Sequence, residues 1–317
     1  MTAPGAPPNE ESVVLVDGPW AHREVSANGA RFHVAECGDG PLVLLLHGFP
    51  EFWWAWREQL VSLASAGFRA VAPDLRGYGA SDKPPRGYDG FTLAADVAGL
   101  VRALGERSCL LVGHDWGGLI AWSVATVHPE LVRGVAVLDT PHPLRLRAGL
   151  LADRRQRAAA THVFAFQTPR LAERMLTKDG AAWVGSALRD WSSPGWPPPD
   201  VERRFRDAML LPKTAHLALE YYRWALRSLV RPDGARWARA LRRGVAVPTL
   251  QLHGTLDPVY LPETAAGSGR WVRAPYTWRP LEGVGHFSAQ EVPERVDAEL
   301  LAWARGLPDD GSLRLTR

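Results

Sequence analysis

The chain has 317 residues, of which 46% are hydrophobic and 22% charged, which is ordinary for a globular protein and excludes a disordered chain. The formal net charge is +3, from 37 basic and 34 acidic side chains, so the charge balance does not indicate a nucleic-acid partner. Two cysteines are too few for a disulfide framework. The N-terminal stretch has neither a basic region nor an apolar run, so we expect a soluble, cytoplasmic protein that does not insert into a membrane.

The first half of the chain alternates short apolar runs with helical patterns. We expect strands at residues 13–16, 31–35, 42–46, 69–72, 109–112 and 134–138, and helices at 54–66, 91–104 and 117–127. The continuous apolar run at 42–46 is typical of a strand buried on both faces. The alternation predicts a mostly parallel α/β sheet that is covered by helices on both faces.

The alternation stops after residue 140. Residues 141–245 show no convincing strand and predict an inserted helical cap. Strand patterns return at 248–253 and 277–281, and a last helix is expected at 293–305. We therefore expect a core made of residues 13–140 and 246–305, the cap between its two parts, and tails at 1–12 and 306–317.

The motif Gly-His-Asp-Trp-Gly-Gly at 113–118 follows a predicted strand and opens a predicted helix. This is the setting of a nucleophile elbow, a strained turn that presents one side chain above the sheet. Serine usually occupies that position, but here it is Asp115. A carboxylate suits displacement at a saturated carbon, which forms an alkyl-enzyme ester that water must then cleave. The simpler reading is an aspartate that caps the helix.

Cleavage of such an ester needs a base and donors for the oxyanion. His286, flanked by glycine in a loop after the last predicted strand, is expected to activate the water. Its orienting acid is either Asp257 or Asp139, since both follow predicted strands; we favour Asp257 and expect the other aspartate to be structural.

The oxyanion donors are expected to be two backbone amides. A loop that ends the strand at 42–46 can aim the N–H of Phe49 at the elbow, and the N–H of Trp116 follows the nucleophile directly. Gly and Pro in the first loop could also mark a simple turn.

Taken together, these segments resemble the epoxide hydrolases of the α/β-hydrolase superfamily, the branch with an aspartate nucleophile that is related to haloalkane dehalogenases. The segments are His-Gly-Phe-Pro-Glu-Phe-Trp at 47–53, Asp-Leu-Arg-Gly-Tyr-Gly-Ala-Ser-Asp at 74–82, the motif at 113–118 and Gly-His-Phe at 285–287. The resemblance implies an α/β-hydrolase fold with a cap, an acid after either of the two strands, and often a cis peptide at Phe49–Pro50.

Epoxide hydrolases usually carry two cap tyrosines that donate hydrogen bonds to the epoxide oxygen, which leaves as an alkoxide. Tyr222 matches the second of these. The first has no tyrosine counterpart, and the best match is His162, for which donation and simple packing are equally expected. For the neighbouring Tyr221 we expect packing.

The expected reaction is hydrolysis of an epoxide to a vicinal diol through an ester on Asp115. The alternatives are a haloalkane dehalogenase with the same nucleophile, or a non-catalytic binding protein on this fold. We expect a small apolar epoxide and water as the reactants, no nucleic acid, and a monomer or homodimer. No phosphate-binding loop or metal-ligand spacing is present in the sequence, so no cofactor or metal is implied.

Overall fold

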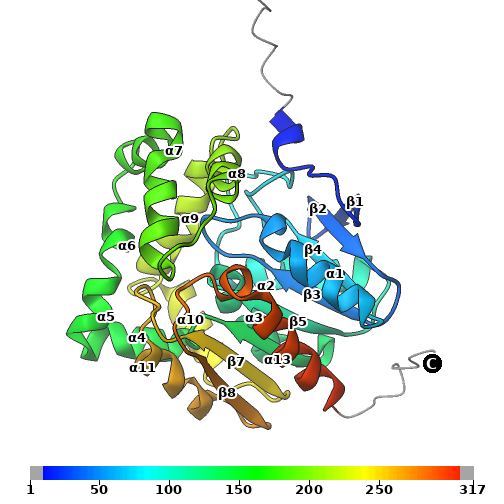
Figure 1. Cartoon of the computed structure of the whole chain (residues 1–317). Helices are drawn as coiled ribbons and strands as arrows, with labels where there is room; N and C mark the ends of the chain where they lie inside the picture. The colour runs from blue at the N-terminus through cyan, green and yellow to red at the C-terminus, as the bar shows by residue number, and fades with distance from the viewer. Residues whose placement is uncertain (1–9, 308–317) are drawn as a thin grey trace, which may run out of the picture.

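An eight-stranded sheet forms the centre of the molecule, with strand order β1-β2-β4-β3-β5-β6-β7-β8 (Figure 1). The structure is a computed structural model that describes residues 10–307, so most of the two predicted tails lies outside the described residues. The strands are β1 (Ala21–Ala27), β2 (Ala30–Cys37), β3 (Leu42–Leu46), β4 (Arg69–Pro73), β5 (Cys109–His114), β6 (Val132–Leu138), β7 (Thr249–Gly254) and β8 (Tyr276–Leu281). The pairs β1–β2 and β2–β4 are antiparallel and the remaining pairs are parallel, which confirms the predicted mostly parallel α/β class.

The N-terminal edge of the sheet differs from the sequence prediction in two places. Residues 13–16 form no strand; the 3₁₀ helix η1 (Glu10–Val13) ends at the first of them, and the carbonyl of Val14 accepts the indole N–H of Trp53 at 2.7 Å. The edge strand β1 was not predicted, because most of its side chains are exposed and its sequence lacks a long apolar run. Apolar content alone is therefore a poor guide at a solvated sheet edge.

Helices cover both faces of the sheet. On one face α1 (Arg57–Ser65), which follows the 3₁₀ helix η2 (Trp53–Trp56), contacts α13 (Pro293–Arg305). On the other face α2 (Gly90–Ala103) packs against α3 (Trp116–Val127). The N-terminus of α2 is fixed by Asp89, whose carboxylate accepts the N–H groups of residues 91 and 92.

A helical segment lies between β6 and β7 and sits beside one edge of the sheet layer (Figure 1). Its helices are α4 (Pro143–Ala152), α5 (Arg154–Ala159), α6 (Thr161–Ala165), α7 (Leu171–Trp191), α8 (Pro199–Met209), α9 (Thr214–Arg227) and α10 (Pro232–Leu241). Shorter elements in the core are η3 (Pro129–Leu131), α11 (Pro262–Ala266), η4 (Gly267–Trp271) and α12 (Ser288–Glu291). We refer to α4–α10 as the cap.

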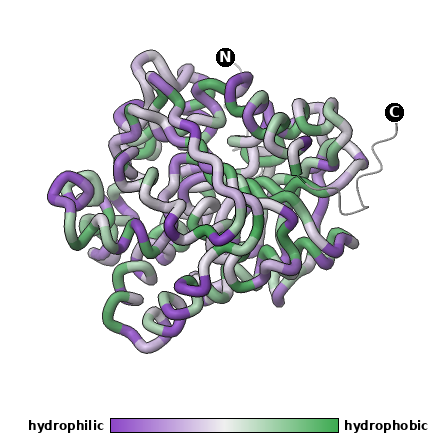
Figure 2. The backbone as a smooth tube through the Cα atoms, turned by 90° about the horizontal axis from the view of Figure 1, so that it is seen from below, coloured by the Kyte–Doolittle hydropathy of each residue, from purple (hydrophilic) through white to green (hydrophobic). Residues whose placement is uncertain are grey.

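Hydrophobic segments run through the middle of the molecule, and strongly hydrophilic ones gather on the outlying helices (Figure 2). Strands β3 and β5 are buried along their whole length, as expected for central parallel strands. The loops that follow their carboxyl ends are therefore anchored on rigid, buried strands. None of the described helices combines the length and apolar character that a membrane crossing requires.

Candidate active site

Asp115 occupies the tight turn between β5 and α3. Its backbone has φ 48° and ψ −117°, a conformation that costs free energy for any residue with a side chain. Two glycines let the turn close: a Cβ at Gly113 would lie 2.3 Å from the carbonyl oxygen of Gly117, and one at Gly117 would lie 2.1 Å from that of Leu46. The strain and close packing are those of a nucleophile elbow.

The two oxygens of the Asp115 carboxylate have different surroundings. Oδ1 accepts a hydrogen bond of 2.9 Å from the backbone N–H of Phe49, and the Phe49–Pro50 peptide is cis, as the resemblance implied. Oδ2 lies 3.6 Å from Nε2 of His286. The N–H of Trp116 is at the first position of α3, where an N–H has no partner within the helix.

The site keeps Asp115 ionised although its side chain is buried. Burial alone would raise the pKa of this carboxyl, but the charges of His286 and His114, with the hydrogen bond from the Phe49 N–H, hold it below its usual value. The N-terminal end of α3 also favours negative charge. Asp115 is therefore a carboxylate at neutral pH, which is the form a nucleophile needs.

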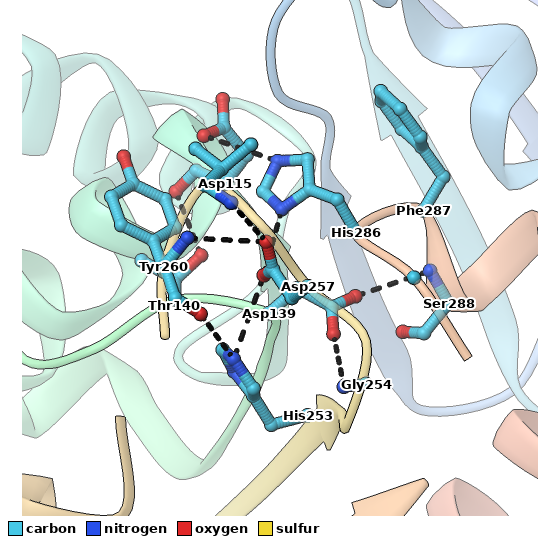
Figure 3. Close-up of polar contacts among 12 residues, drawn as sticks. Asp115, Asp139, Thr140, His253, Gly254, Asp257, Tyr260, His286, Phe287 and Ser288 are labelled. Atoms are coloured by element: carbon cyan, nitrogen blue, oxygen red, sulfur yellow. Dashed lines mark hydrogen bonds and ion pairs between the residues drawn. The ribbon is translucent and has the colours of Figure 1, made fainter. Parts of the chain in front are cut away.

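His286 is fully buried between two carboxylates (Figure 3). Its Nδ1 lies 2.9 Å from Oδ2 of Asp257, and its Nε2 faces Asp115. Burial disfavours the imidazolium, yet Asp257 and Asp115 together raise the pKa of His286 well above its usual value. In the resting protein the ring is thus an imidazolium whose Nδ1–H donates to Asp257 and whose Nε2 faces Asp115 at 3.6 Å.

Asp257 is itself held by its own loop. Its Oδ1 accepts the backbone N–H groups of Val259 at 2.7 Å and Tyr260 at 3.1 Å. Oδ2 is thereby left to face His286, which fixes the direction of the histidine ring.

Asp139, the second candidate acid, has other partners. Its two oxygens accept the backbone N–H groups of Gly254 at 2.8 Å and Ser288 at 3.1 Å. Asp139 therefore ties the end of β7 to the loop after His286. The structure brings Asp257, and not Asp139, into contact with Nδ1 of His286.

Ligand atoms of Asp139, His253 and Asp257 lie within 4.8 Å of one another, an arrangement that could hold a metal ion. These atoms already have protein partners, however: Nε2 of His253 lies 2.7 Å from the carbonyl of Tyr260, and the two carboxylates bind N–H groups and His286. The cluster is therefore a network of hydrogen bonds that supports His286 from below.

The cap residues named from the sequence also lie at this site. Tyr222, on α9, packs edge-on against the rings of Phe49 and Trp116. Its ring centroid lies 5.4 Å from that of Phe49 and 5.0 Å from that of Trp116. The ring of His162 lies 5.9 Å from that of Tyr222. Tyr221 turns away and donates its hydroxyl to the carbonyl of Arg76 at 2.8 Å, which is a packing role.

His162 is neutral at pH 7, because burial lowers its pKa to about 4. A neutral imidazole carries one N–H donor and one acceptor nitrogen.

Sequence reasoning missed two features of the site. Tyr260, three residues after Asp257, turns its phenol toward Asp115 (Figure 3). Beneath the site, Nδ1 of His114 lies 2.8 Å from the buried carboxylate of Glu51, and its Nε2 lies 2.7 Å from the carbonyl of His286. His114 could have been suspected because it directly precedes Asp115; no signal in the sequence marks Tyr260 as a neighbour of Asp115.

Comparison with known proteins agrees with this geometry. The sequence pattern of the alpha/beta hydrolase fold matches residues 41–291, so the chain is an α/β-hydrolase. It is 31% identical to epoxide hydrolase A of Mycobacterium tuberculosis, over 92% of this chain and 99% of that protein. It is 34% identical to epoxide hydrolase 3 of Xenopus tropicalis, over 88% and 76% of the two chains. The chain belongs to the epoxide hydrolase family.

Solved structures that resemble this chain are also those of epoxide hydrolases. The crystal structure of epoxide hydrolase A from Mycobacterium thermoresistibile superposes with a TM-score of 0.79 and 28% identity, covering 91% of this chain and 99% of that one. An epoxide hydrolase of Bacillus megaterium in complex with an inhibitor also has a TM-score of 0.79, with 26% identity over 89% and 100% of the chains.

Proposed function

We propose that this protein hydrolyses epoxides to vicinal diols through a covalent ester on Asp115. The observation that carries the proposal is the asymmetric setting of the Asp115 carboxylate. Oδ1 is bound by the Phe49 N–H, so Oδ2 is the oxygen left to attack a carbon. A carboxylate in the nucleophile position attacks carbon, which is the chemistry that an epoxide requires.

In the first step Oδ2 forms a bond to one epoxide carbon and the carbon–oxygen bond of the ring breaks. The epoxide oxygen leaves as an alkoxide and takes a proton from Tyr222. Burial, and then the charge of Asp115, raise the pKa of Tyr222 well above its usual value, so the phenol is protonated at the start. Attack removes the negative charge of Asp115 and makes the proton easier to give.

In the second step water attacks the carboxyl carbon of Asp115, and His286 takes the proton of the water. The same loss of charge on Asp115 lowers the pKa of His286, so the resting imidazolium gives its proton to the phenolate that Tyr222 became in the first step, and the neutral ring then acts as the base. Asp257 keeps Nδ1 protonated and Nε2 directed at the ester. The N–H groups of Phe49 and Trp116 stabilise the oxyanion that forms on Oδ1.

We assign epoxides rather than haloalkanes because of Tyr222. A halide leaves as a stable anion and needs no proton, whereas an epoxide oxygen does. The phenol of Tyr222 lies against Phe49 and Trp116, directly beside the nucleophile. The relatives named above are all epoxide hydrolases.

A single-turnover reaction in heavy-oxygen water tests the ester mechanism. With the enzyme in excess over styrene oxide, the first diol should carry an oxygen from Asp115 and no label from water, and the label should appear in the peptide that contains Asp115. A labelled diol in the first turnover would mean that water attacks the epoxide directly. No diol from a panel of epoxides would contradict the proposed function itself.

A further inference from the structure

Tyr260 is a buried phenol beside the nucleophile to which the two steps above give no task. Its side chain reaches toward Asp115 from the loop that follows Asp257 (Figure 3), and its ring centroid lies 5.8 Å from that of His286. It is 8% exposed. Burial raises its pKa, and the charge of Asp115 adds to this, so the hydroxyl is protonated in the resting protein.

The backbone around Tyr260 is held from several directions. Its N–H donates to Asp257, and its carbonyl faces Nε2 of His253. From the cap, the side-chain amide of the buried Gln156 donates to the carbonyl of Val259 at 2.8 Å and accepts the N–H of Leu261 at 3.0 Å. A segment clamped between core and cap places its side chain with the accuracy that proton transfer needs.

The two phenols approach Asp115 from different elements. Tyr222 comes from the cap helix α9 and packs over Phe49 and Trp116, the residues of the proposed oxyanion site. Tyr260 comes from the core and stands beside His286, the residue that activates water. The positions separate their tasks: Tyr222 serves the departing epoxide oxygen, and Tyr260 serves the bond between Asp115 and the product.

We propose that Tyr260 donates the proton that releases the diol from Asp115, an inference that rests on the proposed function. After water has added to the carboxyl carbon, the bond from that carbon to Oδ2 breaks and its electron pair stays on Oδ2, the oxygen that leaves in the diol. Oδ2 takes the proton of Tyr260.

The protons balance over the cycle. His286 gave its resting proton to the phenolate of Tyr222, and it keeps the proton that it took from water, so it is again an imidazolium. The carboxylic acid that remains on Asp115 gives its proton to the phenolate of Tyr260. Water and epoxide are consumed, the diol is released, and all four side chains return to their starting forms.

Three tyrosine-to-phenylalanine variants of the full chain test this assignment: Tyr260→Phe, Tyr222→Phe, and Tyr221→Phe as the matched control whose hydroxyl binds the Arg76 carbonyl. Rapid quench followed by intact-protein mass spectrometry gives the rates at which the ester forms and decays with styrene oxide. Tyr260→Phe should slow decay about 100-fold, within the usual range for a general acid. Its ester formation should stay within about threefold of wild type, since a proton donor for release takes no part in the attack on the epoxide.

The steady-state parameters give an independent reading. Slower decay leaves more enzyme as ester, so kcat and KM fall together in Tyr260→Phe and kcat/KM changes little. In Tyr222→Phe ester formation should slow instead, and kcat/KM should fall. Tyr221→Phe should leave both rates near wild type.

Two results would overturn the inference alone: an unchanged decay rate in Tyr260→Phe, or a loss of ester formation equal to the loss of decay, as a merely structural role would give. If none of the variants, nor the wild type, forms an ester with any epoxide, the proposed function fails as well.

Discussion

At the scale of single residues, the site depends on which carboxylate contacts which histidine nitrogen. Asp257 and Asp139 both follow strands that end at the same edge of the sheet, and the sequence does not separate them. The structure does so through hydrogen bonds: Asp257 faces Nδ1 of His286, while Asp139 binds two backbone N–H groups. Their substitution should therefore have different consequences.

Asp257→Asn should slow ester cleavage by roughly 10³- to 10⁴-fold, as loss of an orienting acid does elsewhere. Asp139→Asn keeps one acceptor oxygen and should reduce activity less than about tenfold, but it should lower the free energy of unfolding by about 1–3 kcal/mol. Ester decay rates and urea unfolding of both variants measure this. Equal kinetic losses would contradict the distinct roles assigned to these aspartates.

The charge of Asp115 should control the pKa of His286. Asp115→Asn removes the charge as the ester does, so the pKa of His286 should fall relative to the wild type, because the charge of Asp115 raises it. Nuclear magnetic resonance titration of the His286 ring measures the shift. An unchanged pKa would mean that the base is not released by formation of the ester.

At the scale of elements, the turn between β5 and α3 is held by close backbone contacts. Gly117→Ala would bring a Cβ to 2.1 Å from the carbonyl oxygen of Leu46, and the buried strand β3 has little room to move. We expect a loss of about 1–3 kcal/mol in the free energy of unfolding, with loss of ester formation.

Gly306→Ala is the matched control for this substitution, since its Cβ would meet nothing closer than 3.5 Å. Urea unfolding should show this variant within about 0.5 kcal/mol of the wild type. If Gly117→Ala were equally stable and active, the close contact at the elbow would not be a requirement of the fold.

Many elements could be predicted from the sequence, for reasons that the structure makes clear. The apolar run at 42–46 coincides with β3, because a central parallel strand is apolar on both faces. The last helix was also located correctly. The edge strand β1 was not predicted from the sequence, because its side chains are mostly exposed.

The site could be predicted where its residues directly follow predicted strands, as Asp115, Asp257 and His286 do. The Gly-His-Asp-Trp-Gly-Gly motif located Asp115 because strand, turn and helix are adjacent in the chain. Tyr260 reaches Asp115 only through the loop after Asp257 and its clamp by Gln156 in the cap. Such a contact depends on the packing of distant segments, which no local pattern records.

At the scale of the whole molecule, buried histidines make stability depend on pH. His142 is fully buried at the N-terminus of α4, between the rings of Trp122 and Trp271. Burial lowers its pKa from 6.5 to about 3. In the native protein the ring stays neutral, whereas the unfolded chain takes up a proton below about pH 6.5, so stability is lost as the pH falls.

This contribution is measurable with a variant that does not titrate. His142 accepts the N–H of Leu144 as the cap of α4, and asparagine is a favourable residue at such a position. Between pH 7 and pH 5 the wild type should lose about 2 kcal/mol more than His142→Asn, as measured by urea unfolding at each pH. If the free energy of unfolding fell equally with pH in the wild type and in His142→Asn, His142 would be taking up its proton in the folded state.

The measurement that tests the central claim most directly is intact-protein mass spectrometry of His286→Gln after incubation with styrene oxide. Without the base that activates water, the variant should stop as the alkyl ester, with one epoxide molecule added and located on the peptide that contains Asp115. A parallel incubation with 1-bromobutane separates the two substrate classes. No adduct from the epoxide, an adduct on another residue, or an adduct from the bromide alone would contradict the account.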